Sequence, residues 1–304
     1  MKAGIDFGFG QVKFYTESGK GKFPTEVKEF RKTSFVSIQK RTVSYGGKEY
    51  FVGEEAQSYS KGIPIVIADV ERLIEYVPVF CRYLAMKGVK ATEVVTGLPP
   101  SHMNLKEEMR KKVAEGFSVP EENVSVVPQG SGILLDVEDK VEDFILVLDV
   151  GFNTLDYVVA RRGNPQLGEA EFEIEEAGSF HRLGTYSLIK EVESLFAGEF
   201  PELNTLLTYH DLAKVVRERK LKIGGKEYDL SEIVDRAREA YEIKLQGAIM
   251  RLLDEIKRCN TLVVGGGGAY LLEEEFLRSL HPNVVVPEEP DLSQARGYYK
   301  LLEE

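Results

Sequence analysis

The chain has 304 residues, of which 43% are hydrophobic and 29% are charged, and this length and composition are ordinary for a folded protein with two packed lobes. Its longest apolar runs, such as 144–150, fall far short of the roughly 20 residues of a membrane helix, and the sequence from Met1 lacks the pattern of an export signal. We therefore expect a cytoplasmic protein without membrane contact. The formal net charge of -11 disfavours direct binding to nucleic acid, whose phosphates would repel it.

Predicted strands and helices alternate through the first half of the chain, which opens with a hairpin. An apolar strand at 2–7 is followed by a glycine turn and a returning strand at 12–16. Further strands are predicted at 34–38, 42–45, 49–52, 93–96 and 124–127, and helices at 70–87 and 104–115. Cys81 and Cys259 both lie in helix-like apolar patterns without metal-ligand spacing, so we expect them in the core.

The second half opens with the same device as the first. An apolar strand at 141–149 turns and returns as a strand at 155–160. In each half an aspartate, Asp6 or Asp149, ends the apolar strand and is followed two residues later by a glycine. The two halves therefore have the pattern of a duplication.

The remainder of the chain is predicted to be mainly helical. Helices are expected at 183–196, 209–219 and 231–258, with a hairpin at 222–228 between the last two. A strand at 261–264 then leads into a run of glycines and a helix that starts near Ala269, and the final helix is expected at 292–303, after Pro287 and Pro290. Because no linker separates the halves, they should share an extensive interface.

The two glycine turns have the chemistry of an anion site. Successive backbone N–H groups in such turns form concavities that bind anions. A single glycine-rich hairpin is weak evidence, but two with an aspartate at the same offset can hold a polyphosphate from opposite sides, with the aspartates around a hydrated Mg²⁺. Lys13 could bring a cation to the phosphates or be an exposed strand lysine. Asn153 and Thr154 add donors or are ordinary turn residues.

The glycine run 265–268 is a third candidate element. Glycines between a strand and a helix let a nucleoside approach the backbone closely, beside the positive end of the helix dipole. A packing turn is the alternative. The run lacks the acidic ribose ligand of a dinucleotide fold, and the chain has no Gly-Lys-Ser/Thr phosphate loop, so a different nucleotide-binding architecture is indicated.

Three segments together resemble the motifs of the actin/Hsp70/sugar-kinase superfamily. Residues 6–13 (DFGFGQVK) are similar to its first phosphate motif, 148–156 (LDVGFNTLD) to its second, and 262–268 (LVVGGGG) to its adenosine motif. The resemblance implies an α/β, actin-like (ribonuclease H-like) fold, with two duplicated lobes around a nucleotide cleft and a mixed sheet flanked by helices in each. It also implies a first lobe of residues 1–140 plus 288–304 and a second lobe of residues 141–287, with smaller outer subdomains at about 28–65 and 200–232.

Two further segments favour the ParM/StbA branch of this superfamily. Residues 95–100 (VTGLPP) are similar to its Gly-Leu-Pro segment, and residues 289–300 (EPDLSQARGYYK) to its closing helix. Two positions depart from the pattern. Phe152 replaces a small or acidic residue of the second phosphate turn, and Ser293 stands where asparagine is common.

The resemblance also assigns roles to residues of this chain. Asp6 and Asp149 would orient the water shell of Mg²⁺, Lys13 would contact the β- and γ-phosphates, and Gln129 would position the attacking water, close to the metal through water, unless it only caps a helix. Tyr270 would pack near adenine or in the core. The cofactor-binding set implied is Asp6, Gly8, Phe9, Gly10, Gln11, Lys13, Asp149, Gly151, Phe152, Asn153, Thr154, Gly178, Arg217, Glu218, Gly265, Gly266, Gly267, Gly268 and Tyr270.

The function implied is that of an actin-like ATPase that binds Mg-ATP, with GTP as the alternative nucleotide. Hydrolysis would proceed by in-line attack of water on the γ-phosphate. The protein would assemble into nucleotide-dependent filaments for plasmid segregation or cytoskeletal positioning, with itself and a DNA-binding adaptor as partners and no direct contact with nucleic acid or membrane. The alternative is a small-molecule kinase of the same superfamily, which needs a carboxylate base beside the acceptor, and the sequence shows no further acidic motif that supplies one.

Overall fold

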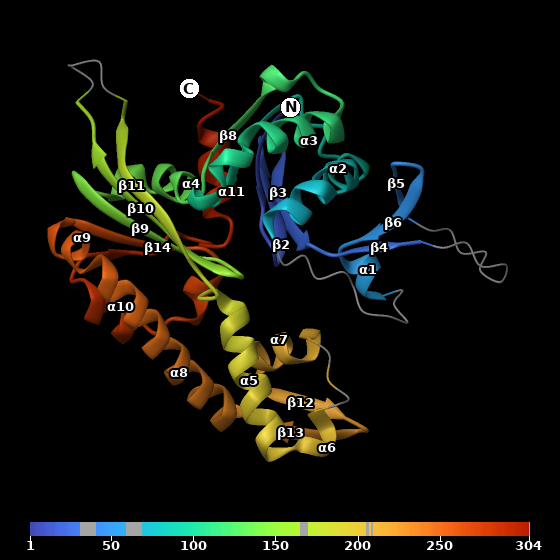
Figure 1. The fold of residues 1–304 in the computed structure, drawn as a ribbon, viewed down its shortest axis with the longest axis vertical. Coiled ribbons are helices and arrows are strands. Elements are labelled where there is room, and N and C mark those ends of the chain that lie inside the picture. The colour runs from blue at the N-terminus through green and yellow to red at the C-terminus, as the bar shows by residue number, and fades with distance from the viewer. Residues whose placement is uncertain (31–40, 59–68, 165–169, 205–206, 208, 304) are drawn as a thin grey trace.

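The computed structural model describes residues 1–30, 41–58, 69–164, 170–204, 207 and 209–303 (Figure 1). The strand predicted at 34–38 lies outside the described residues. Within them, no helix is both long and apolar enough to cross a bilayer.

The first large sheet is built around the N-terminal hairpin. Its strand order is β3 (Gly19–Pro24), β2 (Gln11–Thr16), β1 (Lys2–Phe7), β7 (Glu93–Leu98) and β8 (Val124–Pro128). The hairpin pairs are antiparallel, whereas β1, β7 and β8 are parallel to one another. Helices α2 (Val70–Met86) and α3 (Lys106–Phe117) share a core with the Ala3, Ile5 and Phe7 face of β1. The sheet is therefore mixed, with helices packed on it.

The second large sheet repeats this plan. Its order is β11 (Phe172–His181), β10 (Thr154–Arg162), β9 (Phe144–Val150), β14 (Thr261–Gly265) and β15 (Val284–Val285). Again the hairpin strands are antiparallel and the last pairs parallel. Helices α5 (Thr185–Glu199) and α8 (Ser231–Ile249) pack on the Leu146 and Leu148 face of β9. The duplication inferred from the two aspartate turns is thus present in the strand order.

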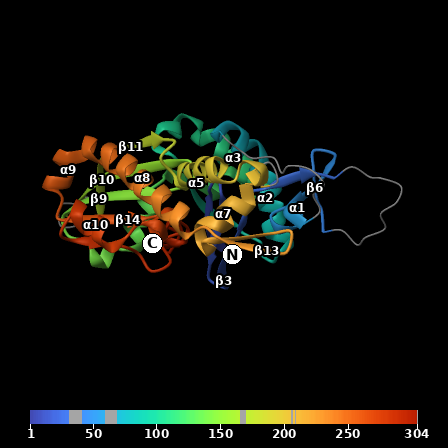
Figure 2. The same ribbon diagram turned by 90° about the horizontal axis from the view of Figure 1, so that it is seen from below.

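Two small sheets lie apart from the large ones, as Figures 1 and 2 show. One consists of β4 (Val27–Glu29), β6 (Lys48–Val52) and β5 (Val43–Tyr45) beside α1 (Glu54–Ser58). The other pairs β12 (Lys220–Ile223) with β13 (Lys226–Asp229), near α6 (Pro201–Asn204) and α7 (Tyr209–Glu218). Both fall within the ranges predicted for outer subdomains, and the lobe limits themselves stay a prediction.

Helices α4 (Ser131–Asp136) and α11 (Ser293–Lys300) join the two large sheets. Helix α11 packs on β1 and β2 and also on α4. The Ile133 and Leu134 side chains of α4 belong to a core cluster with β9, β10 and β14. Helix α4 therefore contacts both α11 and the second sheet, and the limit of the first lobe at residue 140 stays a prediction.

Several predicted elements differ from the structure. The helix expected from 104 begins at Lys106, after a 3-10 helix η1 (Pro100–Leu105), and the helix expected at 231–258 is interrupted by η5 (Met250–Leu252) before α9 (Leu253–Arg258). The helix expected near Ala269 is wrong, because the glycine run leads into a 3-10 turn, η6 (Gly267–Leu271), and the next α-helix, α10, is Glu274–Leu280. Two further short 3-10 helices are η2 (Glu121–Asn123) and η3 (Glu138–Lys140). Both cysteines are buried, as predicted.

Candidate functional site

A cavity of about 830 Å³ opens where the two hairpins meet. Its lining comes from the β1–β2 turn, the β9–β10 turn, the glycine run and α7. Of the predicted set it includes Asp6, Gly8, Phe9, Gly10, Gln11, Lys13, Gln129, Asp149, Gly151, Phe152, Thr154, Arg217, Gly267, Gly268 and Tyr270. The sequence therefore predicted residues from distant parts of the chain that the fold brings to one place.

The two glycine turns close in the same way. The Gly8 N–H donates to the Gln11 carbonyl over 3.2 Å, and the Gly151 N–H donates to the Thr154 carbonyl over 2.9 Å. Each hairpin also places a charged residue directly across from its aspartate, although the residue differs. Asp6 is paired with Lys13 across β1 and β2, and Asp149 is paired with Asp156 across β9 and β10.

The tips of the two turns touch each other. A Cβ added at Gly10 would lie 3.0 Å from the ring of Phe152, so glycine lets the turns approach this closely. The start of α5 holds the second of these turns. The Thr185 N–H donates to the Gly151 carbonyl over 3.0 Å, and the Tyr186 N–H donates to the Phe152 carbonyl over 2.9 Å. Phe152, the departure from the family pattern, thus packs between the hairpins.

Lys13 and Gln129 both bind the Asp6 carboxylate. Lys13 Nζ lies 2.7 Å from Asp6 Oδ2, and the Gln129 amide Nε2 donates to Asp6 Oδ1 over 3.3 Å. Burial would lower the pKa of Lys13, but Asp6, Asp149 and Asp291 together hold it above its ordinary value. The Lys13 side chain is only 14% exposed, so the alternative of an exposed strand lysine is wrong. Gln129 does not cap α4, whose N-cap is Gly130.

Asp149 and Asp156 form a crowded pair of carboxyl groups. Both are buried, at 9% and 2% exposure. Burial, followed by the charges of Asp156 and Asp6, raises the pKa of Asp149 to about 7, with Lys13 acting in the opposite direction. Burial likewise raises the pKa of Asp156 to about 6, although the Thr154 hydroxyl donates to it over 2.8 Å. The three carboxyl groups Asp6, Asp149 and Asp156 together outnumber the one positive charge of Lys13, which is bonded to Asp6.

These carboxylates fit a hydrated Mg²⁺ as the missing positive charge. Asp6, Asp149 and Asp156 line one cavity, and Asp156 Oδ1 is buried without a hydrogen-bond partner among the described residues. Mg²⁺ is usually held by one or two carboxylates together with water and phosphate oxygens. The described residues contain no group of three metal-ligating side chains close enough to hold an ion by themselves. The donor set therefore suits an ion that shares its coordination with water and a phosphate.

The glycine run forms the wall beside Asp149. Gly265 is paired with Asp149 in the parallel ladder, and Gly266 adopts a φ of 79°, in the left-handed region that favours glycine. A Cβ at Gly266 would lie 2.2 Å from Asp149 Oδ1. The first two glycines thus allow close packing behind the aspartate, and Gly267 and Gly268 face the cavity. Because no α-helix starts here, the predicted helix dipole at this position is wrong.

Comparisons with known proteins identify the family. A model of the N-terminal domain of actin-like proteins matches residues 4–132, and a model of the C-terminal part of archaeal MreB-like actin homologues matches residues 147–278. The chain belongs to the actin-like proteins. This confirms the fold class and the superfamily predicted from the three motifs.

Solved structures similar to this actin-like protein share its fold over nearly the full length. A ParM, the pCBH ParM non-polymerisable quadruple mutant, is 21% identical, with 99% of this chain and 98% of that chain covered and a TM-score of 0.77. Ta0583, an archaeal actin homolog in complex with ADP, is 20% identical, with 100% and 99% covered and a TM-score of 0.76. MamK from a double helical filament is 19% identical, with 100% and 98% covered and a TM-score of 0.72. No curated protein sequence matches the chain significantly.

The far wall of the cavity in this actin-like protein is polar and half-exposed. Tyr270 lines this wall and is 59% exposed. Packing in the core therefore does not explain this tyrosine. Its hydroxyl donates to Asp291 Oδ1 over 3.0 Å, and Lys22 Nζ lies 2.5 Å from Asp291 Oδ2. Burial would raise the pKa of Asp291, but the bond to Lys22 and its charge hold it below the ordinary value.

Five predicted residues do not line the cavity of the actin-like protein. Asn153 faces a second cavity, and Gly265 and Gly266 lie behind Asp149. Gly178 lies in β11, opposite Tyr157 of β10, and a Cβ added at Gly178 would lie 2.6 Å from the Tyr157 ring. Glu218 is paired with Lys214 over 3.7 Å, and Lys214 lines the cavity in its place.

Several residues that line the cavity were not predicted as site residues. The charged ones include Asp156, Lys22 and Lys214, and Asp291 is bonded to Lys22. Asp156 was within the quoted second motif, and its position two residues into the returning strand, equivalent to Lys13, could have indicated it. Lys22 lies on β3, a strand that the sequence pattern did not predict.

Proposed function

We propose that the chain binds Mg-ATP in the cavity between its hairpins and hydrolyses it. The observation that carries this proposal is the convergence of two equivalent aspartate turns, from residues 6–11 and 149–154, on one cavity of about 830 Å³. A volume of this size suits a ligand as large as a nucleotide. GTP is the alternative nucleotide.

Each group at the cavity has a role that follows from its position. The turns present backbone N–H groups to the phosphates from both sides. Lys13 carries its positive charge to the β- and γ-phosphates, and it is kept protonated by the surrounding carboxylates. Bound Mg²⁺ would spread the charge that develops on the phosphates. Asp6 and Asp149 would orient its water shell.

Gln129 is placed to orient the attacking water. Its backbone N–H is fixed by the Leu98 carbonyl at 2.7 Å, and its side-chain amide reaches Asp6 in the cavity. While Asp6 holds the amide nitrogen, the amide oxygen is able to accept a hydrogen bond from the attacking water and so orient it. In-line attack on the γ-phosphate then needs little covalent assistance from the protein.

The same proposal includes assembly into filaments that depend on nucleotide state. Support comes from similar proteins, since a ParM of Clostridium botulinum is described as a 15-stranded filament and MamK as a double helical filament. In this chain the nucleotide cavity lies between the two sheets, so a nucleotide that binds both turns favours one relative position of the halves. Such a bias can change the affinity of one subunit for another. Plasmid segregation or cytoskeletal positioning, with a DNA-binding adaptor, is the corresponding cellular role.

Sedimentation with Mg-ATP, Mg-ADP, Mg-GTP and no nucleotide tests the proposal. Pelleting that requires a nucleotide, together with phosphate release, is the expected result. A protein that neither binds nor hydrolyses nucleotide would overturn it.

The kinase alternative is favoured by one feature of the cavity. Asp156 is a buried carboxyl group with a raised pKa of about 6, which is the kind of base that acceptor activation needs. A protein that stays monomeric and whose turnover rises when a small hydroxylated acceptor is added would support this alternative over a filament.

A further inference from the structure

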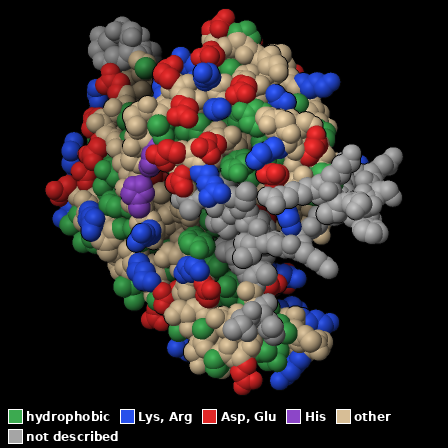
Figure 3. All heavy atoms as spheres, turned by 45° about the vertical axis from the view of Figure 1, so that its right-hand side comes forward, with side chains coloured by type: hydrophobic (Ala, Val, Ile, Leu, Met, Phe, Trp, Pro, Cys, Tyr) green, Lys and Arg blue, Asp and Glu red, His purple; other side chains and the backbone are tan. Residues whose placement is uncertain are grey.

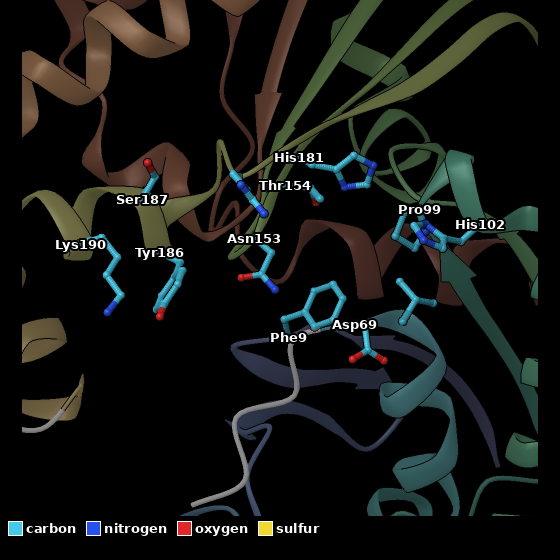
Figure 4. Close-up of a pocket in the computed structure, with 12 residues that line it drawn as sticks. Phe9, Asp69, Pro99, His102, Asn153, Thr154, His181, Tyr186, Ser187 and Lys190 are labelled. Atoms are coloured by element: carbon cyan, nitrogen blue, oxygen red, sulfur yellow. The ribbon is translucent and has the colours of Figure 1, made fainter. Parts of the chain in front are cut away.

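A second cavity, of about 690 Å³, lies on the other side of the hairpin tips. Among the described residues it shares only Phe9 and Thr154 with the nucleotide cavity. Figure 4 shows its lining, with His102 and Pro99 on one side, Tyr186 and Lys190 on the other and Asn153 between them. Both halves of the molecule contribute walls, so the cavity is a groove between them that is open to solvent.

The cavity is lined by two cationic side chains, Arg182 and Lys190, and by two imidazole rings, His102 and His181. Among the described lining residues the single acid is Asp69, and its carboxylate already accepts the Arg72 N–H at the start of α2 over 2.8 Å. Figure 3 shows a face of the molecule on which histidine side chains lie next to Lys and Arg side chains. In a protein with a net charge of -11, such a basic cavity favours an anion.

Arg182 is the more available of the two cationic side chains. Its side chain makes no hydrogen bond or ion pair with any described residue, whereas Lys190 is held by Glu193 at 2.6 Å and lies over the Tyr186 ring. Arg182 also has a φ of 61°, a left-handed conformation that costs energy for a residue other than glycine or asparagine. Backbone strain of this kind often occurs where a side chain is aimed at a ligand.

The two histidines come from different halves and face each other. The rings of His102 and His181 have centroids 6.1 Å apart. The Ser101 hydroxyl lies 2.9 Å from His102 Nδ1 and 3.3 Å from the Ser179 hydroxyl of β11. These contacts between the halves hold His102 in place before a ligand arrives.

We propose that this second cavity is a binding site for a small phosphate-bearing anion. Arg182 would form the bidentate contact that guanidinium groups make with phosphate, and His102, His181 and the Asn153 amide would donate from the remaining sides. The ligand is either free inorganic phosphate or a phosphate monoester, because both present the same oxygens to these donors. The proposal does not require that a nucleotide binds in the first cavity.

Calorimetric titration with inorganic phosphate and with glycerol phosphate tests the site. The informative variant is Arg182→Asn, because asparagine tolerates the left-handed backbone while the cation is lost. Arg219→Asn is the matched control, since Arg219 has the same residue type and a φ of 59° but lies at the end of α7, outside the cavity. We expect R182N to weaken binding at least tenfold and R219N to change it less than twofold. His102→Gln, on the opposite wall, should weaken binding in the same direction.

Lys13→Gln separates this site from the nucleotide cavity. If the proposal holds, K13Q binds phosphate as the wild type does and R182N does not. This result does not depend on whether a nucleotide binds in the first cavity. Binding lost in K13Q and retained in R182N would overturn it, as would saturable binding of neither anion to the wild-type protein. Binding of both anions identifies a site for phosphate esters, and binding of inorganic phosphate alone identifies free phosphate as the ligand.

Discussion

At the scale of single residues, the two hairpins differ at one pair of equivalent positions. The position across from the aspartate is Lys13 in the first hairpin and Asp156 in the second. The first hairpin thereby brings a cation to the cavity and the second brings another carboxylate. The two hairpins thus have the same backbone arrangement but opposite charges at this position. This suits a ligand that carries negative charge on one side and positive charge on the other, as a metal-bound polyphosphate does.

Lys13→Gln should weaken the binding of Mg-ATP. Lys13 is buried beside Asp6, and a hydrogen bond to a charged group is worth about 1.5–3 kcal/mol, so affinity should fall roughly 10- to 150-fold. Lys48→Gln is the control, because Lys48 forms a more exposed pair with Glu29 in the outer sheet. Calorimetric affinity of K13Q within twofold of the wild type would show that Lys13 does not contact the nucleotide.

Asp156→Asn should stabilise the fold above pH 6 when metal and nucleotide are absent. The folded protein raises the pKa of Asp156 from an ordinary 3.8 to about 6, so the neutral acid is favoured in the fold. The wild type then loses stability as pH rises from about 4 to about 6, by up to roughly 3 kcal/mol, and asparagine avoids this loss.

Urea unfolding in EDTA at pH 4 and pH 7 measures this difference. The stability of D156N relative to the wild type should increase between the two pH values. Asp143→Asn, an exposed aspartate just before β9, should show no such increase. An equal difference at both pH values would mean that Asp156 titrates normally in the fold.

At the scale of elements, the sequence predicted the two hairpins that form the site. It did not predict strands that depend on pairing with a neighbouring strand. The two hairpins were predictable because apolar strands end in Asp and Gly at a fixed offset. Strand β3 begins Gly19-Lys20-Gly21-Lys22 and has no apolar alternation, so only its pairing with β2 makes it a strand. Strand β11, at the edge of its sheet, has the exposed glutamates Glu175 and Glu176 in its middle and no clear apolar alternation, so the sequence pattern did not predict it.

The glycine run shows a different limit of prediction. The pattern of strand, glycines and apolar residues indicated a helix near Ala269, but the chain first makes a 3-10 turn. The Gly266 N–H donates to the Pro290 carbonyl over 3.0 Å, a contact from a distant segment that no local pattern reveals. The residues of the site were therefore predictable by type and spacing, while their partners, such as Asp291 for Tyr270, required the fold.

Asp69 has two separable effects on helix α2 and on the second cavity. As the N-cap it accepts the Arg72 N–H, so Asp69→Ala should lower the free energy of unfolding by about 1 kcal/mol. Asp69→Asn should retain the cap, because asparagine accepts equally well, and should strengthen phosphate binding by removing the acid from the cavity lining. Urea unfolding and phosphate titration of both variants check this. A D69N variant as unstable as D69A would exclude a capping role.

At the scale of the whole molecule, the pair of helices α4 and α11 connects the two sheets. Arg296 Nη2 lies 2.6 Å from Asp136 Oδ2, and the Ser293 hydroxyl donates to the same oxygen over 2.6 Å. Asp136 is almost fully buried, at 3% side-chain exposure. Helix α11 covers β1 and β2, and α4 packs on the second sheet. A change in the relative position of the two halves must therefore change the contact between α4 and α11.

Gly297→Ala should uncouple the two halves. The helices touch so closely that a Cβ at Gly297 would lie 1.7 Å from the Gly132 carbonyl oxygen, and backbone cannot give way as a flexible side chain can. The helices must separate, which disrupts the packing on both sheets, so we expect a loss of about 3 kcal/mol or more. Gly198→Ala, in α5 with open space around the added methyl, should instead stabilise the protein by about 0.5–1 kcal/mol.

Differential scanning calorimetry with and without Mg-ATP distinguishes uncoupling from simple destabilisation. If α4 and α11 transmit the position of one half to the other, the wild type unfolds in one transition and G297A in two, since each sheet keeps its own core. Nucleotide would then raise both transitions only if it still bridges the two hairpins across the cavity. A single transition of G297A at the wild-type temperature would show that the halves are held together mainly by the hairpin tips, where Gly10 meets Phe152.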